Sequence, residues 1–192
     1  MLAAGASRRF EGVKALAPIE GKPMLQWAID ALSSADIDGL TIVLGAHAAE
    51  IVSQIAPRDA TLVVQEDWGE GMAASLRAGI ASLPSPEAGV LIALADQPDI
   101  GAADYGRLIS TWRAAPETPA AATYANTRGA PCIIPAAFRS ALLALQGDQG
   151  ARVLLRTLTD VIEVPMEKAA RDIDTRDDWH SHLRDKSLRE PP

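Results

Sequence analysis

The chain has 192 residues, a length that suits one compact domain, and 48% of them are hydrophobic and 22% charged, as in ordinary globular proteins. The net charge of −7 argues against duplex nucleic acid or an anionic membrane surface as the main partner. The single cysteine, Cys132, allows neither an intrachain disulfide nor a thiolate metal cluster, and no apolar run approaches the length of a membrane helix, so a cytoplasmic location is expected.

Positive charge gathers at the start of this acidic chain. Residues 1–22 carry a net charge of +2, so the other 170 residues carry −9. A local basic patch predicts a small anionic ligand. The first Gly-rich turn lies at Gly5, although a phosphate-binding loop normally follows a buried strand of about five or six residues. Either the first strand is stunted or Met1 is not the natural start, and we favour the second explanation.

Short β-branched runs alternate with helical patterns along the first half of the chain. Three runs are apolar throughout, as in strands buried on both faces of a parallel sheet, and they cover 40–44, 61–65 and 89–95. Helices are predicted at 23–33, 46–55, 72–83 and 102–114. In the less regular second half, the predicted strands are 120–125, 132–134 and 161–165, and the predicted helices are 136–145, 151–157 and 176–183.

This alternation predicts βαβ units and therefore an α/β fold. We expect a single Rossmann-like three-layer domain with a mostly parallel central sheet over residues 1–183. The remaining residues, 184–192 (RDKSLREPP), are charged and end in two prolines, and we expect them to form a frayed tail.

Small and basic side chains are combined in residues 2–10 (LAAGASRRF), with Lys14 four residues further on. Small residues let backbone N–H groups approach the oxygens of a triphosphate, and Arg9 and Lys14 can neutralise phosphate charge. The segment is not a Walker A loop, which requires GxxxxGK[ST]. The alternative is a flexible basic terminus that contains a turn.

Three aspartates are candidate metal ligands. Asp96 follows a predicted buried strand, and ligands of open α/β sheets bind beyond the carboxyl ends of the strands. Mg²⁺ prefers one or two carboxylates together with phosphate oxygens and water. Asp172 and Asp174 are two apart, so an extended backbone would point both to one face. Alternatively, Asp96 caps a helix, and Asp172 or Asp174 caps the last helix.

Other polar and aromatic residues give weaker signals. The histidines, His47, His180 and His182, do not form a metal set, and we expect all three at the surface. The tryptophans are expected to be packing residues, although Trp68 can border a base pocket. Cys132 is expected to be buried and inert.

Six segments, in the same order along residues 2–175, resemble the MobA-like nucleotidyltransferases. They are 2–14 (LAAGASRRF and Lys14), 67–76 (DWGEGMAASL), 95–98 (ADQP), 129–131 (GAP), 147–152 (GDQGAR) and 172–175 (DIDT). Within the family they are most similar to the molybdenum cofactor cytidylyltransferases. The sequence departs from the pattern at Glu11, at 65–66 (QE) and at Ala130, and the last two departures concern ribose or acceptor contacts.

The resemblance implies a fold of the nucleotide-diphospho-sugar transferase type and a set of site residues. The catalytic residues would be Arg9, Lys14 and Asp96, and the metal ligands Asp96 with Asp172 or Asp174. The nucleotide would contact Leu2, Ala3, Ala4, Gly5, Ser7, Gly71, Met72 and Ser75. Asp148 and Arg152 would hold the acceptor, or else belong to a surface loop and a helix start.

The implied reaction is Mg²⁺-dependent transfer of CMP from CTP to the terminal phosphate of molybdenum-bearing molybdopterin, with release of pyrophosphate. CTP rather than GTP is implied by the sequence LAAG in place of LAGG. A molybdoenzyme or its chaperone could receive the product. Two alternatives stay open: a related transferase that acts on another phosphorylated acceptor, and a non-catalytic cofactor-binding module on the same fold.

Overall fold

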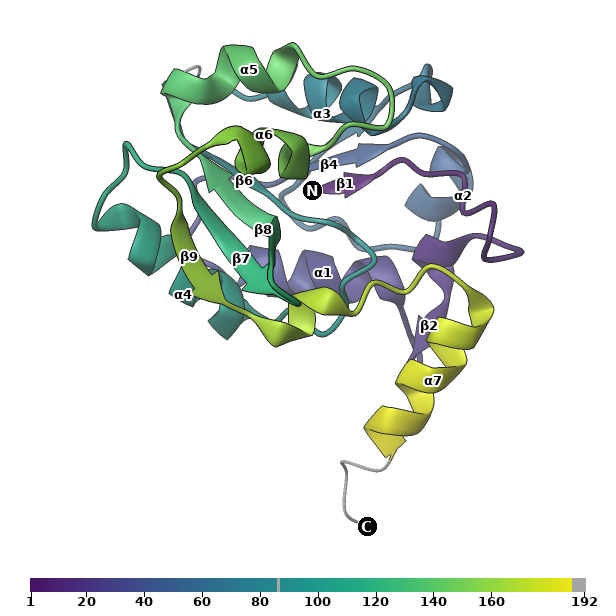
Figure 1. The fold of residues 1–192 in the computed structure, drawn as a ribbon. Coiled ribbons are helices and arrows are strands. Elements are labelled where there is room, and N and C mark those ends of the chain that lie inside the picture. The colour runs from purple at the N-terminus through teal and green to yellow at the C-terminus, as the bar shows by residue number, and fades with distance from the viewer. Residues whose placement is uncertain (86, 188–192) are drawn as a thin grey trace.

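The middle layer of the molecule is formed by two sheets that lie edge to edge, as seen in the computed structural model, which describes residues 1–85 and 87–187 (Figure 1). The first sheet is parallel and has the order β1 (Leu2–Ala3), β4 (Thr41–Leu44), β5 (Thr61–Val64). The second has the order β6 (Val90–Ile92), β8 (Thr127–Ile134), β7 (Ala120–Tyr124), β9 (Ile162–Pro165).

Leu2 joins the two sheets. Its N–H donates to Ala93 O at 2.9 Å, and its C=O accepts a hydrogen bond from Ala95 N at 3.1 Å, so it forms a parallel bridge with Leu94. Within the described residues of these two sheets, β8 is the one strand that runs against both of its neighbours, β6 and β7. The next pair, β7 and β9, is parallel. The expected mostly parallel sheet is therefore confirmed.

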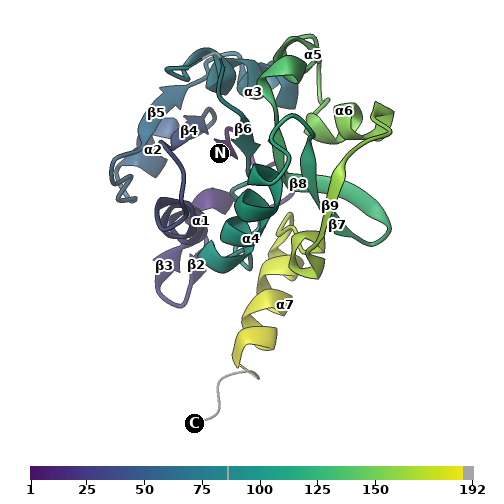
Figure 2. The ribbon, with the colours of Figure 1, turned by 90° about the vertical axis from the view of Figure 1, so that its left-hand side faces the viewer.

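Helices cover both faces of the sheet layer (Figures 1 and 2). One face carries α1 (Met24–Ser33) and α4 (Ala102–Arg113), and the other carries α3 (Met72–Ala81), α5 (Arg139–Leu143) and α6 (Ala151–Thr157). The short α2 (Ala48–Val52) follows β4, and α7 (Arg176–Ser187) projects from the C-terminal side. The smaller elements are the hairpin strands β2 (Pro18–Ile19) and β3 (Lys22–Pro23) and the 3-10 turns Lys14–Leu16, Trp68–Glu70, Ala136–Phe138 and Glu167–Ala170.

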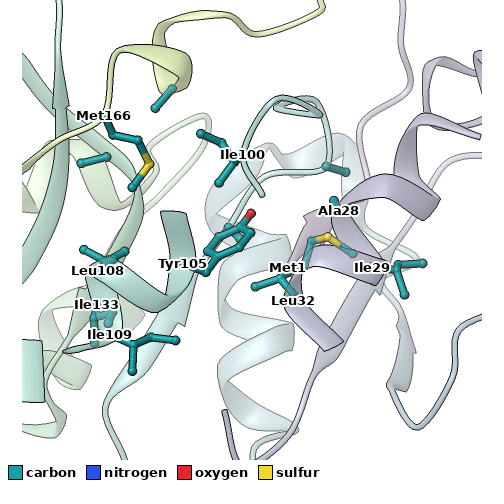
Figure 3. Close-up of a cluster of buried hydrophobic side chains, with 14 of the residues drawn as sticks. Met1, Ala28, Ile29, Leu32, Ile100, Tyr105, Leu108, Ile109, Ile133 and Met166 are labelled. Carbon is teal, nitrogen blue, oxygen red and sulfur yellow. The ribbon is translucent and has the colours of Figure 1, made fainter. Parts of the chain in front are cut away.

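Two hydrophobic clusters fill the spaces between the layers. Beneath α1 and α4, Met1 and Leu32 lie near Tyr105 and Ile109 in a cluster that includes β4 and β7 (Figure 3). On the opposite face, α3 and α6 pack over Cys132 of β8. As expected, Cys132 is fully buried, and this burial raises the pKa of its thiol to about 12. No helix of the described residues is both long and apolar enough to cross a bilayer.

Most predicted elements are present, but several differ in length. The helix expected at 46–55 is only Ala48–Val52, because His47 at its start adopts a left-handed conformation with φ of 61°. The strand expected at 132–134 begins at Thr127, because Ala125 and Asn126 both have positive φ and form a tight hairpin turn. The helix expected at 136–145 is divided into a 3-10 turn and α5.

The last helix is longer and better packed than we expected. It continues to Ser187, so residues 184–187 of the expected frayed tail are helical, and residues 188–192 lie outside the described residues. The expectation that His182 lies at the surface is wrong: it is 8% exposed, and its Nδ1 lies 3.7 Å from Asp99 Oδ2. Burial is the main cause that lowers the pKa of His182, because α7 packs its inner face against the loop after β6.

Asp30 of α1 is the centre of a polar cluster at the edge of the fold. Its carboxylate accepts hydrogen bonds from Lys22 Nζ at 2.7 Å, Gln26 Nε2 at 3.0 Å and Arg58 at 2.8 and 3.0 Å. Partial burial alone would raise the pKa of Asp30, but these hydrogen bonds outweigh it and lower the pKa to about 2. The cluster joins α1 to β3 and to the loop before β5.

Asp30→Asn should reduce the free energy of unfolding by about 1–2 kcal/mol at pH 7, because the folded state stabilises the ionised carboxylate through hydrogen bonds that the unfolded state lacks. The folded-state pKa is depressed, so this stabilisation is present above the unfolded value of 3.8 and is lost as pH falls through about 2. Denaturant unfolding at several pH values measures it. Asp160→Asn, at an exposed position, is the control and should change little; equal effects would contradict the assignment.

At Gly71, the backbone at the start of α3 lies very close to the backbone of the loop before α6. Its φ is +104°, and a Cβ there would lie 2.5 Å from the carbonyl carbon and oxygen of Gly147. The same Gly147 oxygen accepts a hydrogen bond from Ala73 N at 3.0 Å. The start of α3 and the loop before α6 therefore fit together only when residue 71 has no side chain.

Gly71→Ala should lower the free energy of unfolding by about 2 kcal/mol, or Tm by about 4–8 °C, because both the steric contact and the positive φ are unfavourable. Gly69→Ala is the matched control, since no heavy atom lies within 4 Å of a Cβ built there. Thermal unfolding of both variants compares them. A loss in Gly71→Ala no larger than in Gly69→Ala would show that this approach imposes no constraint.

Candidate active site

A cavity of about 480 Å³ opens beyond the carboxyl ends of β1 and β6. Its wall is built by the loop after β1, the entry of α3, the chain after β6 and the segment before α7. Thirteen of the residues proposed from the sequence line it: Leu2, Ala3, Ala4, Gly5, Ser7, Arg9, Lys14, Gly71, Met72, Ser75, Asp96, Asp148 and Asp174. Asp172 and Arg152 are not among its lining residues.

The loop after β1 is fixed at both ends. At its start, Ala46 N donates to Ala4 O at 3.2 Å, and a Cβ on Gly45 would lie 2.7 Å from the same oxygen. Further on, Ser7 has a positive φ of 53°, and its Oγ accepts a hydrogen bond from Lys14 N at 3.2 Å. The loop is therefore held against the end of β4, while a Cβ on Gly5 would meet no heavy atom within 4 Å. This geometry leaves room for backbone approach to an anion.

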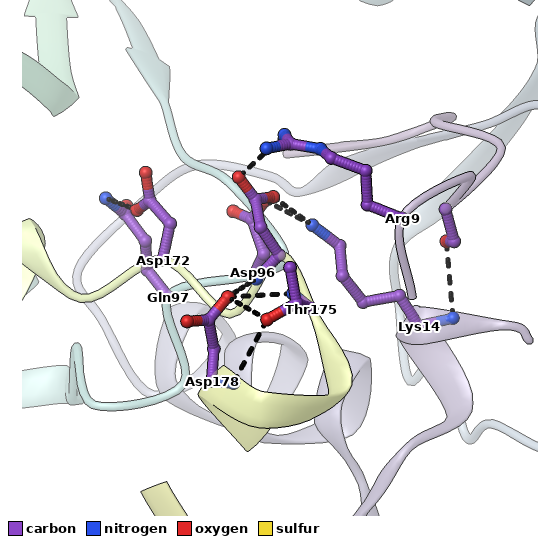
Figure 4. A network of polar contacts seen from close by, with 9 residues as sticks. Arg9, Lys14, Asp96, Gln97, Asp172, Thr175 and Asp178 are labelled. Atoms are coloured by element: carbon purple, nitrogen blue, oxygen red, sulfur yellow. Dashed lines mark hydrogen bonds and ion pairs between the residues drawn. The ribbon is translucent and has the colours of Figure 1, made fainter. Parts of the chain in front are cut away.

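The ammonium group of Lys14 is shared by two carboxylates. Its Nζ lies 2.8 Å from Asp96 Oδ2 and 3.0 Å from Asp174 Oδ1 (Figure 4). Burial alone would lower the pKa of Lys14, but the charge of Asp96 and the hydrogen bonds to both carboxylates outweigh burial and raise it. Lys14 is therefore cationic at any physiological pH.

Arg9 reaches the same group of side chains from outside. Its NH2 lies 2.9 Å from Asp174 Oδ2, although the Arg9 side chain is 72% exposed. An ion pair this exposed stabilises the fold little, so Arg9 is held only weakly in this position. Arg9 and Lys14 together bring two positive charges to the cavity, as the basic start of the sequence predicts.

Asp96 has the environment of a cation ligand. Its Oδ1 is buried and has no hydrogen-bond partner among the described residues, which is costly for a carboxylate oxygen. The neighbouring Asp174 supplies a second carboxylate through the shared Lys14. No group of three or more His, Cys, Asp or Glu ligands occurs within residues 1–85 and 87–187. Two carboxylates suit Mg²⁺, which completes its shell with substrate oxygens and water.

The two candidate aspartates of the C-terminal segment have different partners. Ile173 N donates to Asp96 O at 2.9 Å, which ties this segment to the chain after β6. Asp174 points to Lys14, whereas Asp172 Oδ1 accepts a hydrogen bond from Gln97 Nε2 at 3.0 Å (Figure 4). The expectation that both share one face does not hold, because the backbone here is not an extended strand.

Asp172 nevertheless lies close enough to Asp96 for the two carboxyl groups to interact electrostatically. Its carboxyl group is partly enclosed by its neighbours, and this enclosure together with the negative charge of Asp96 raises its pKa. Gln97, which is 1% exposed, also donates to Ala169 O at 3.0 Å. The sequence did not predict a role for Gln97, although its position directly after Asp96 already placed it beside the site.

The last helix is capped by residues that sequence reasoning also missed. Thr175 Oγ1 accepts a hydrogen bond from Asp178 N at 3.1 Å, and Asp178 Oδ2 accepts one from Thr175 N at 2.8 Å. This reciprocal pair is a capping box, and its signal is Thr-x-x-Asp at 175–178. The alternative that Asp172 or Asp174 caps the helix is therefore not needed, and Asp174 faces the cavity.

The two residues proposed for acceptor binding lie apart. Asp148 lines the cavity next to Gly71. Arg152 is exposed and donates from its NH2 to Tyr124 OH at 3.3 Å. Trp68 borders the cavity, as expected, and Ser75 is buried beside it at 5% exposure.

Comparisons with known proteins agree with this architecture. The nicotine blue oxidoreductase of Paenarthrobacter nicotinovorans is 34% identical over 187 residues, which cover 91% of this chain and 90% of that protein. The crystal structure of Rv0371c from Mycobacterium tuberculosis superposes with a TM-score of 0.83 at 29% identity and 95% coverage of each chain. The Rv0371c complex with manganese gives 0.80 at 28% identity, again over 95% of each chain.

A more distant structure shares the fold alone. Molybdopterin-guanine dinucleotide biosynthesis protein A from Archaeoglobus fulgidus has a TM-score of 0.69 at 18% identity, covering 97% of each chain. The sequence model of the MobA-like NTP transferase domain matches residues 1–162, from the residue before β1 to the first residue of β9. The cavity, the Lys14–Asp96 pair and this match lead to one conclusion: the chain belongs to the MobA-like NTP transferase family.

Proposed function

We propose that the protein is a Mg²⁺-dependent cytidylyltransferase, which transfers CMP from CTP to the terminal phosphate of molybdenum-bearing molybdopterin and releases pyrophosphate. The observation that carries this proposal is the pairing of Asp96, with its unpartnered buried Oδ1, and Asp174 around Lys14 beside the loop after β1. We place the reaction in the cytoplasm. The choice of CTP and of molybdopterin comes from the LAAG and ADQP resemblance in the sequence.

Each side chain has a role that its position supports. The loop at residues 3–7 lines the cavity and would bind the triphosphate through backbone N–H groups, while Lys14 and Arg9 would neutralise the leaving pyrophosphate. Asp96 and Asp174 would hold the Mg²⁺, which supplies charge neutralisation at the α-phosphate when bound. Gly71, Met72 and Ser75 would contact the base and ribose.

The reaction requires no strong general base. The attacking acceptor phosphate is already ionised at neutral pH, its oxygen forms the new bond to the α-phosphorus, and the bond to pyrophosphate breaks. Catalysis then depends on positioning and charge neutralisation, as in other phosphoryl transfers. The absence of histidine from the cavity lining of the described residues suits this chemistry.

The remaining choice concerns the acceptor. Asp148 lines the cavity on the side of α3, and Arg152 of α6 donates to Tyr124 at the end of β7. We propose that the molybdopterin phosphate enters from this side. A related transferase on another phosphorylated acceptor would use the same nucleotide residues, so product analysis separates the two.

A redox activity is the second candidate, favoured by the 34% identity to a protein named nicotine blue oxidoreductase. The two reactions differ in their products, since only the transferase releases pyrophosphate from a nucleotide. A non-catalytic cofactor-binding module would do neither, although it would bind one of these molecules.

Pyrophosphate release should occur with Mg²⁺, CTP and molybdenum-bearing molybdopterin together, and should be far slower with ATP, GTP or UTP. A coupled pyrophosphate assay with each nucleotide, with and without acceptor, measures this specificity. Release with another nucleotide would keep the transferase and overturn the choice of CTP. No release with any nucleotide, together with consumption of an electron donor, would favour the second candidate.

Asp96→Ala should abolish turnover while leaving Tm almost unchanged, because the charged group that it removes serves the substrate complex. Asp174→Asn should lower kcat at least ~100-fold, and Asp172→Asn should have a much smaller effect, since its carboxylate faces Gln97. Asp160→Asn is the surface control. An active Asp96→Ala enzyme would exclude the proposed metal site, and equal losses in Asp172→Asn and Asp174→Asn would overturn the distinction between them.

A further inference from the structure

Asp178, on the first turn of α7, holds the backbone on both sides of Asp174. Its Oδ2 accepts hydrogen bonds from Asp174 N at 3.1 Å, from Thr175 N at 2.8 Å and from Thr175 Oγ1 at 2.8 Å (Figure 4). The two backbone N–H groups belong to the peptide planes before and after the Asp174 Cα. Because only φ and ψ connect these planes, their bonds to one oxygen restrict both angles and hence the direction of the Asp174 side chain.

One of these hydrogen bonds goes beyond what a helix cap requires. In a capping box, the first residue and the residue three positions later exchange one bond in each direction, as Thr175 and Asp178 do here. The bond from Asp174 N reaches one residue further back, outside the box. It links the start of α7 to the residue whose carboxylate enters the cavity.

The Asp174 side chain has only basic partners among the described residues. Its Oδ1 lies 3.0 Å from Lys14 Nζ, and its Oδ2 lies 2.9 Å from Arg9 NH2. The proposed reaction assigns both of these cations to the phosphates of the nucleotide. When they turn to the substrate, the direction of the Asp174 carboxylate depends on its backbone alone, and Asp178 is the side chain that holds this backbone.

Asp178 does not itself contact the cavity. It is exposed and is not among the residues that line the candidate active site. The hydrogen bond from the Thr175 side chain is the main cause that lowers the pKa of its carboxyl group, so Asp178 accepts these bonds as an anion at neutral pH. Its neighbour Asp177 is also exposed, and its side chain makes no such contact within the described part of α7.

We propose that Asp178 is a positioning residue, which holds Asp174 in the direction in which its carboxylate binds the divalent cation together with Asp96. The inference rests on the proposed function, since it requires that Asp174 is a metal ligand. Groups that orient a metal ligand typically change metal affinity by about 10–100-fold when they are removed. Asp178 therefore acts on the reaction through Asp174 and not by contact with the substrates.

The test measures Mn²⁺ binding to the full chain from the electron paramagnetic resonance signal of the free ion, so the readout is independent of turnover. Asp178→Ala should raise the Kd for Mn²⁺ about 10-fold or more, because Asp174 then adopts other directions. Asp178→Asn should bind Mn²⁺ almost as tightly as the unchanged chain, since its amide oxygen accepts the same hydrogen bonds without the charge.

Two control variants separate position from charge and from helix stability. Asp177→Ala removes the same charge from the same turn of α7 and should leave the Kd for Mn²⁺ unchanged. Leu183→Ala weakens the packing of α7 against the cluster that contains Phe10 and Ile19. It should lower Tm at least as much as Asp178→Ala does, yet leave the affinity for Mn²⁺ in place.

Each outcome bears on the proposal. A loss of affinity in Asp178→Ala that Asp178→Asn restores supports the positioning role. Equal losses in Asp178→Ala and Asp178→Asn would mean that the charge acts directly, and equal losses in Asp178→Ala and Leu183→Ala that helix stability does; either result overturns the role. Full affinity in Asp178→Ala with a loss in Asp174→Asn would overturn the role but keep the metal site. No Mn²⁺ binding by the unchanged chain, or full affinity in Asp174→Asn, would overturn the metal site itself and the role with it.

Discussion

One ammonium group connects three distant parts of this chain. Lys14 comes from the N-terminal loop, Asp96 from the chain after β6 and Asp174 from the segment before α7, and all three meet at Nζ within 3.0 Å. Two carboxylates this close would repel each other, and Lys14 removes that repulsion. The shape of the cavity therefore depends on a charge supplied by residue 14.

The C-terminal segment is held at this place by contacts on both sides of Asp174. Before it, Ile173 binds the backbone of Asp96 and packs beside Phe10. After it, Arg176 donates to the carbonyl oxygens of Phe10 and Glu11 at 3.2 and 2.9 Å. Residues at the far end of the chain thus fix the loop that carries Arg9. This explains why the C-terminal segment lies beyond the sheet yet takes part in the site.

The sequence predicted the parts of this structure that follow from local patterns. Buried parallel strands are apolar throughout, and a phosphate-binding loop needs small residues, so both were recognisable. It also predicted that the residues around Lys14 and Asp96 would converge, because strand ends meet at one edge of a sheet. The hairpin at Ala125 and Asn126 was missed, since this dipeptide is not the usual turn sequence.

Other features depend on long-range packing that no local pattern contains. The different partners of Asp172 and Asp174 follow from the position of Gln97, which lies 75 residues from Asp172. His182 has the spacing of a surface residue on a polar helix, but α7 packs over the loop of Asp99 and buries it. In both cases the decisive neighbour comes from another part of the chain.

Charge balance suggests how such a site would respond to its substrates on the proposed function. Asp96 and Asp174 are matched by Lys14 and Arg9, so the group is close to neutral in the free protein. A divalent cation alone would have to compete with Lys14 for the carboxylates, and a nucleotide alone would have to compete with the carboxylates for Lys14 and Arg9. When both arrive together, the carboxylates can turn to the cation and the two basic side chains to the phosphates. The same four side chains then form more ion pairs with the two ligands than with either ligand alone, which favours joint binding of metal and nucleotide.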